Sequence, residues 1–177
     1  AKLGEDGYWM EPENLGDVIN TPYLEQCPFI HPDGKTLYFA SEGHPGMGSA
    51  DLFYSTRDEN GVWSKPINLG YPINTQNREI SLSVSSNGTT AYFSSDRDKT
   101  LGDLDIYSFE LPPAVQAEQV TWVNAIVTDA KTKQPLKASV QLMNIATGEI
   151  VASSNSDPKT GEFLIVLPSG NDYGLFV

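Results

Sequence analysis

The chain has 177 residues, of which 39% are hydrophobic and 19% are charged, a composition typical of a folded globular protein and not of a disordered one. Its formal net charge of −12 repels phosphate backbones and anionic lipid surfaces, which argues against direct nucleic-acid binding. No apolar run approaches the roughly 18 residues of a membrane helix, so direct membrane insertion is not expected.

Short segments rich in β-branched and aromatic residues, separated by turn residues, occupy the first part of the chain. The turn His31-Pro32-Asp33-Gly34 has proline at its second position and Asp-Gly after it, as tight turns favour. Cys27 is the single cysteine, so no internal disulfide can form. The spacing of turns and apolar residues predicts four strands, at 26–30, 36–41, 50–56 and 62–68.

The most informative feature is an internal repeat. Residues 9–21 read WMEPENLGDVINT, and residues 63–75 read WSKPINLGYPINT, without a gap at an offset of 54 residues. We interpret the repeated positions as structural: glycines for tight turns, Asn and Thr for local turn hydrogen bonds, and an aspartate whose carboxylate accepts N–H groups of the preceding loop. These positions are Trp9, Asn14, Gly16, Asn20, Thr21, Asp33, Gly34 and Asp51, then Trp63, Asn68, Gly70, Asn74, Thr75, Gly88 and Asp105.

Beyond the repeats, two prolines followed by small and polar residues predict a linker at 111–118. Residues 119–177 lack the 54-residue pattern and predict a second small β domain. In it, Ala138, Val140 and Leu142 share one face of a strand, and so do Phe163, Ile165 and Leu167. The predicted strands are 120–127, 138–143, 149–153 and 163–167.

The stretch HPDGKTLYFAS, followed by a glycine-rich loop and DLFYS, resembles the PD40 (WD40-like, TolB-type) β-propeller repeat. The resemblance covers residues 9–109, although Ser85-Ser86-Asn87-Gly88 replaces His-Pro-Asp-Gly in the second copy. It implies an all-β fold in which residues 1–110 form two four-stranded blades, 9–62 and 63–110. Because propellers close with about four to eight blades, we expect the chain to be an excerpt, or other chains to complete its ring.

The segments VTDAKTKQPL (127–136) and DPKTGEF (157–163) resemble a carboxypeptidase-regulatory-like domain, a transthyretin-like β-sandwich, here truncated. The order of the two domains is similar to that of OmpA-family, PorE-type outer-membrane proteins of Bacteroidetes type 9 secretion. This resemblance implies a periplasmic, outer-membrane-associated scaffold whose partners are other envelope proteins. Peptidoglycan binding would belong to an OmpA-like domain that these residues do not contain.

We find no catalytic constellation and expect neither an enzyme nor a cofactor. His31 and His44 are the only histidines, and no Gly-x-Ser-x-Gly elbow is present. The loop from Asp96 to Asp105 fails the EF-hand pattern, so we interpret it as a solvated acidic loop. Weak calcium binding by Asp96, Asp98 and Asp103 stays open as an alternative.

The loops at 42–50 and 96–104 occupy equivalent places in the two repeats, so we expect them to emerge on the same side, where rigid scaffolds bind partners. The function that these features predict is a non-enzymatic interaction scaffold. The alternative is a carbohydrate- or peptide-binding accessory module of a secreted hydrolase. Candidate partner contacts are Glu42, His44, Met47, Asp96, Arg97, Asp98, Lys99 and Asp103.

Overall fold

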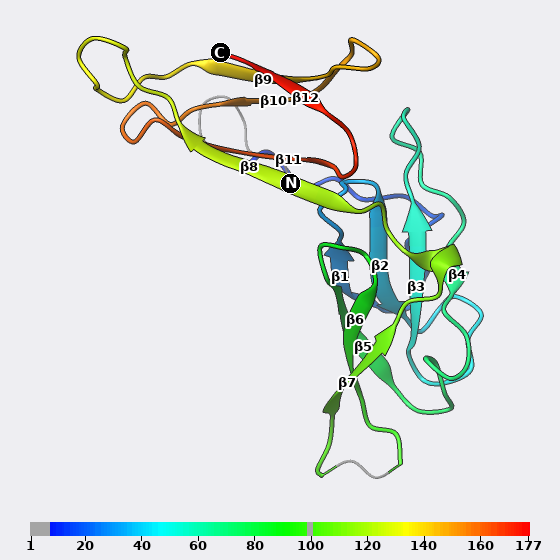
Figure 1. Cartoon of the computed structure of the whole chain (residues 1–177). Helices are drawn as coiled ribbons and strands as arrows, with labels where there is room; N and C mark the ends of the chain where they lie inside the picture. Colours follow the sequence, from blue (N-terminus) through cyan, green and yellow to red (C-terminus); the bar gives the residue numbers. More distant parts are fainter. Residues whose placement is uncertain (1–7, 99–100) are drawn as a thin grey trace. The chain divides into compact units, whose positions relative to one another are not determined.

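The fold is seen in a computed structural model that describes residues 8–98 and 101–177 (Figure 1). Within these residues the regular elements are strands and one short 3-10 helix, which confirms the predicted all-β class. The elements are β1 (Glu25–Ile30), β2 (Thr36–Ser41), β3 (Asp51–Thr56), β4 (Ile67–Asn68), β5 (Glu79–Val84), β6 (Thr90–Ser95), β7 (Asp105–Glu110), η1 (Pro113–Val115), β8 (Val120–Ile126), β9 (Ser139–Asn144), β10 (Ile150–Asn155), β11 (Glu162–Pro168) and β12 (Tyr173–Phe176).

The chain divides into two compact units. Unit 1 comprises Ala1–Ile30, Lys35–Ser83 and Ala91–Glu110, and it contains both sheets of the repeat region. Unit 2 comprises His31–Gly34, Val84–Thr90 and Leu111–Val177. Two turns of the repeats therefore group with the C-terminal residues. The predicted domain bounds of 1–110, 111–118 and 119–177 stay a prediction.

The first repeat forms an antiparallel sheet in the order β1-β2-β3-β4, joined at its first turn by Gly34 in the left-handed region (φ 70°). All six residues of β2 are buried, as expected of a central strand covered on both faces. The fourth strand is shorter than predicted: only Ile67–Asn68 pairs with β3, and Trp63 makes an isolated bridge to Arg57. Pro66, between the two, has no N–H to donate to a ladder.

The second repeat forms a sheet in the order β5-β6-β7, with each strand 54 residues after its counterpart. The prediction of two four-stranded blades is therefore wrong for this copy within the described residues. The position equivalent to β4 falls in β8, which pairs with β11 in another sheet. The physical reason lies in Leu111-Pro112-Pro113, because two consecutive prolines cannot supply N–H groups to a ladder along β7.

The equivalence of the repeats extends to a backbone irregularity. Cys27 in β1 and Ser81 in β5 both adopt positive φ angles, 50° and 57°, and in β1 the pairing register shifts between Gln26 and Phe29. The Ser81 hydroxyl lies 3.3 Å from Cys27 Sγ. The two strands thus meet at the same bulged position, and Cys27 is a half-buried free thiol.

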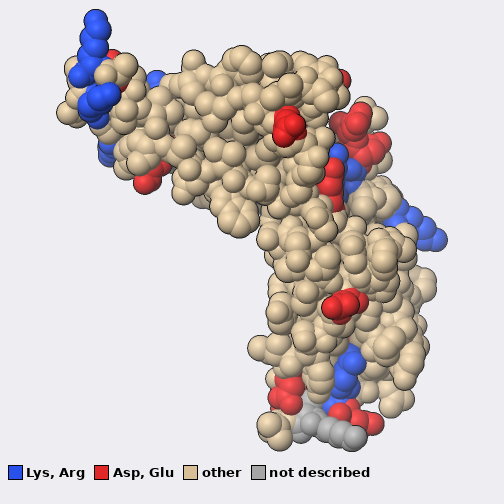
Figure 2. Space-filling model, viewed as in Figure 1, with Lys and Arg blue, Asp and Glu red and all other residues tan. Residues whose placement is uncertain are grey.

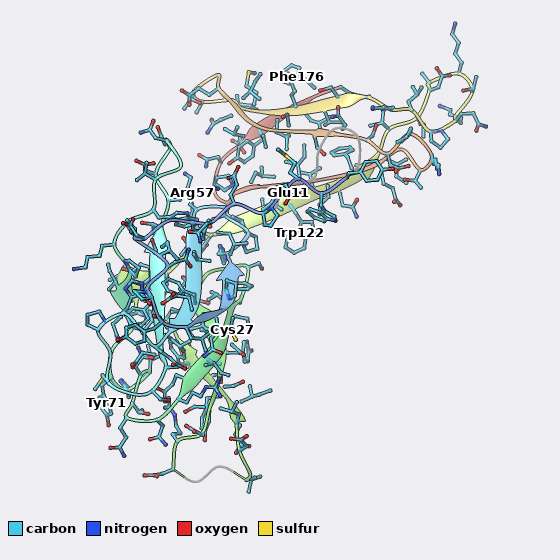
Figure 3. The ribbon with its side chains drawn as sticks, turned by 180° about the vertical axis from the view of Figure 1, so that it is seen from behind. Glu11, Cys27, Arg57, Tyr71, Trp122 and Phe176 are labelled. Carbon is cyan, nitrogen blue, oxygen red and sulfur yellow. The ribbon has the colours of Figure 1, made fainter. Side chains whose placement is uncertain are left out.

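Unit 2 contains two antiparallel sheets, β10-β9-β12 and β11-β8, which share one core. Val140 and Leu142 of β9 pack with Phe163, Ile165 and Leu167 of β11, so the predicted inward faces of both strands are confirmed. The opposite face of the two-stranded sheet stays open: Trp122, which is labelled in Figure 3, is 60% exposed.

The predicted linker is a packed segment. Leu111 and Ala117 are buried, and the Leu111 N–H donates to the Thr89 carbonyl (2.7 Å). A Cβ at Gly88 would lie 2.6 Å from the Ala117 carbonyl oxygen, and Gly88 also has φ 73°. The repeated glycine at this turn therefore serves a close backbone approach as well as a positive φ.

Candidate functional site

The repeat junctions of unit 1 are organised around two equivalent glutamates. Glu79, the first residue of β5, is fully buried and accepts hydrogen bonds from the Thr75 N–H (2.9 Å), the Thr75 hydroxyl (2.7 Å) and the Ser95 hydroxyl (2.9 Å). Glu25 accepts the same three bonds from Thr21 and Ser41, at 2.8, 2.7 and 2.8 Å. Each glutamate thus ties the Asn-Thr turn to the central strand of its repeat.

Burial alone would raise the pKa of Glu25, but the hydrogen bonds from Thr21 and Ser41, together with nearby His44, hold that pKa below its ordinary value. The carboxylate is therefore the form that the turn binds. Sequence reasoning did not assign a role to either glutamate, although the spacing Thr-x-x-x-Glu occurs in both copies.

A cationic or polar ring closes each junction, and the two copies use different positions. In the second repeat, Arg97 donates to the Ile73 carbonyl (2.7 Å), pairs with Glu79 (3.3 Å) and lies over the rings of Phe93 and Tyr107, at 4.8 and 5.0 Å. These contacts consume its donors, since Nε also bonds Ser95.

In the first repeat, the equivalent place is filled by His44. Its Nε2 lies 2.8 Å from the Ile19 carbonyl, and its ring packs on Phe39 and Phe53 at centroid distances of 5.9 and 5.4 Å. Both predicted partner contacts are thus engaged inside their own repeat, where they hold the turn against the sheet.

The Asn-Leu-Gly-x-x-x-Asn-Thr segment of the second copy docks on the first repeat. The Asn74 side chain is buried, and its amide accepts from the Leu52 N–H (2.8 Å) and donates to the Leu52 carbonyl (2.8 Å). Asn74 also donates to Asn68 Oδ1 (2.7 Å), which in turn accepts the Gly70 N–H (2.7 Å). The role predicted for Asn74, local turn bonding, is therefore incomplete: this residue joins two repeats.

The predicted loop anchors are confirmed. Asp51 Oδ2 accepts the N–H groups of Met47 (2.8 Å) and Gly48 (3.0 Å), and Asp105 Oδ2 accepts the Leu101 N–H (2.8 Å). The loop between β2 and β3 then lies against the second repeat, where the Ser49 N–H donates to the Asn77 carbonyl (3.2 Å).

These anchored loops enclose a pocket of about 420 Å³ in unit 1. Three of its side chains, Tyr71, Gln76 and Asp98, are exposed and have no described hydrogen-bond partner, whereas Arg97 is engaged as above. Tyr71 is 78% exposed and lies at the periphery of unit 1 in Figure 3. In Figure 2, acidic and basic side chains gather at the end of this unit where the loop from β6 to β7 lies. The complete lining is Met47, Tyr71, Thr75, Gln76, Asn77, Arg97 and Asp98.

The pocket brings together three of the predicted partner contacts, Met47, Arg97 and Asp98. Glu42 and Asp103 are exposed outside it, and Lys99 lies outside the described residues. Sequence reasoning missed Tyr71 and Gln76, whose signal was only their position beside the repeated Ile-Asn-Thr.

The described aspartates do not gather into a metal site. Asp96 accepts the Arg78 N–H through Oδ1 (2.8 Å), and its carbonyl accepts from Asn77 (3.0 Å). Within residues 8–98 and 101–177, no group of three or more His, Cys, Asp or Glu side chains could hold a metal ion. The calcium alternative for Asp96, Asp98 and Asp103 has no support from this geometry.

The described residues also contain no helix that is long and apolar enough to span a membrane. Comparisons with family models, with curated proteins and with solved structures gave no match for this chain.

Proposed function

We propose that the chain is a non-enzymatic protein-interaction scaffold of the bacterial cell envelope. Unit 1 would contribute two blades of a PD40-type propeller, and the C-terminal strands a carboxypeptidase-regulatory-like, transthyretin-like sandwich. The observation that carries the proposal is the pocket between the two repeats, because its walls are pinned by backbone hydrogen bonds while Tyr71, Gln76 and Asp98 stay available.

The partner chemistry follows from charge and ring. The net charge of −12 and the carboxylate of Asp98 favour a protein segment that carries lysine or arginine. The Tyr71 ring, 78% exposed, can receive such a cation on its face. The resemblance of the repeat to OmpA-family, PorE-type proteins supports a periplasmic, outer-membrane-associated location and a role in type 9 secretion.

Affinity purification from detergent-solubilised outer membranes of the source bacterium tests this function. We expect the chain to recover outer-membrane or secretion proteins, and the double variant Tyr71→Ala/Asp98→Asn to lose them. Tyr23→Ala is the matched control, because Tyr23 is also exposed (71%) but lies outside the pocket. Equal recovery by the double variant, or binding of free glycan and no protein, would overturn the proposal in favour of the accessory-module alternative.

A further inference from the structure

The outer edge of the second repeat is open where the same edge of the first repeat is covered. Leu52 in β3 is fully buried, whereas Ile106, its counterpart in β7, is 78% exposed. Tyr38 in β2 is fully buried, whereas Tyr92 in β6 is 49% exposed. Since the two sheets have the same strand lengths and spacing, the difference comes from what lies against them.

What covers the first repeat is the start of the second. β4 pairs with β3, the Leu69 N–H donates to the Leu52 carbonyl (3.0 Å), and the Asn74 amide bonds both backbone groups of Leu52. In contrast, β7 ends its sheet, and within the described residues no segment outside that sheet is hydrogen-bonded to Ile106. An unpaired strand edge of this kind is a template for a further strand.

The chain carries a second copy of the covering segment, already in its docking conformation. Asn14 Oδ1 accepts the Gly16 N–H (2.8 Å) and the Asn20 amide (3.0 Å), as Asn68 does for Gly70 and Asn74. The Asn20 N–H donates to the Gly16 carbonyl (2.9 Å), as Asn74 does to Gly70 (2.8 Å).

This first copy of the segment has nothing to cover. No described residue donates to the Asn20 side-chain oxygen, whereas Asn74 receives the Leu52 N–H at that atom. Trp9, Leu15 and Val18 beside it are 73%, 42% and 43% exposed. One chain therefore holds both halves of the same interface, each without its complement.

We propose that the edge of β7 binds residues 9–21 of a second copy of this chain. The Asn20 amide of one copy would bond the N–H and carbonyl of Ile106 in the other, and Leu15 would take the place that Leu69 has at Leu52. The contact is heterologous, because the two surfaces differ, so it joins copies head to tail. This inference concerns the strand edge and does not depend on the ligand of the pocket.

The test mixes two variants of the whole chain. Ile106→Lys removes the accepting edge, because a lysine that is tolerated at an exposed site cannot enter a buried one; Asn20→Ala removes the inserted amide. Sedimentation velocity should show concentration-dependent association of the parent chain and association weakened about tenfold or more in each variant alone. An equimolar mixture should form a 1:1 dimer, since each variant retains the half that the other lacks.

Ile150→Lys and Asn60→Ala are the matched controls, because Ile150 (58% exposed) and Asn60 lie outside the proposed surfaces. Both should associate as the parent does. The 1:1 dimer also shows that both test variants are folded. A parent chain that stays monomeric to millimolar concentration would overturn the proposal, and so would a mixture that gives no dimer. A synthetic peptide of residues 9–21 that binds an otherwise monomeric chain would equally overturn the second copy as occupant.

Discussion

The two repeats of unit 1 build one hydrogen-bond network and complete it with different residues. Glu25 and Glu79 hold equivalent turns, but His44 fills the cage of aromatic rings in the first repeat and Arg97 fills it in the second. The repeats also differ in cover, since the first lies under the Asn74 segment and the second does not. Equal sequence motifs therefore create unequal energetic positions, and matched substitutions can measure the difference.

The largest expected difference is between Glu79→Ala and Glu25→Ala. Glu79 is fully buried and pairs with Arg97, so its removal leaves a partly buried guanidinium and two hydroxyl donors without their acceptor. We expect Glu79→Ala to lower the free energy of unfolding by about 3–5 kcal/mol. Glu25 is half-buried and has no arginine partner, so Glu25→Ala should cost clearly less, about 1–2 kcal/mol. Urea unfolding followed by tryptophan fluorescence measures both, and equal losses would contradict the buried-pair account.

The second comparison sets Asn74→Ala against Asn20→Ala. Asn74→Ala leaves the N–H and the carbonyl of Leu52 buried without a partner, which should cost about 2–3 kcal/mol. Asn20→Ala removes only the bond to Asn14 at the surface and should cost less than about 1 kcal/mol in the free chain. Urea unfolding at low protein concentration separates the two, and hydrogen exchange at the Leu52 amide should accelerate only in Asn74→Ala. Unchanged exchange there would contradict the inter-repeat role of Asn74.

A third comparison uses two equivalent glycines. A Cβ at Gly48 would lie 2.0 Å from the Asn77 carbonyl oxygen and 2.7 Å from that of Thr75, and both obstacles are backbone. At Gly102, 54 residues later, nothing lies within 4 Å. We expect Gly48→Ala to cost about 1–3 kcal/mol by forcing the loop away from the second repeat, and Gly102→Ala to be near neutral. Thermal or urea unfolding of the pair decides, and a neutral Gly48→Ala would mean that the loop moves freely.

The strand positions could be predicted because turn residues and short apolar segments repeat with a constant offset. The anchoring by Asp51 and Asp105 was predictable for the same reason, since each carboxylate acts within its own loop. The equivalence of His44 and Arg97 was not, because the two positions differ by one residue from the 54-residue offset and meet only through the folded ring cage. The missing fourth strand of the second sheet also escaped prediction, since the repeat pattern alone does not show that β8 pairs with β11.

The smallest expected effect is a difference in acid sensitivity. The pKa of Glu25 lies below its ordinary value of 4.5 in the folded chain, so in mild acid the unfolded chain binds the proton more readily than the folded one. The stability that this carboxylate contributes is therefore present above about pH 4.5 and is lost as the pH falls through the lowered pKa. We expect Glu25→Gln to flatten the rise of unfolding free energy with pH in this acid range while leaving its slope near neutral pH unchanged. Urea unfolding of both proteins at a series of pH values from 3 to 7 measures the two slopes. Parallel curves for the parent and Glu25→Gln in acid would show that the Thr21 and Ser41 donors do not favour the ionised form, and the turn of the first repeat would then be held by His44 and its rings instead.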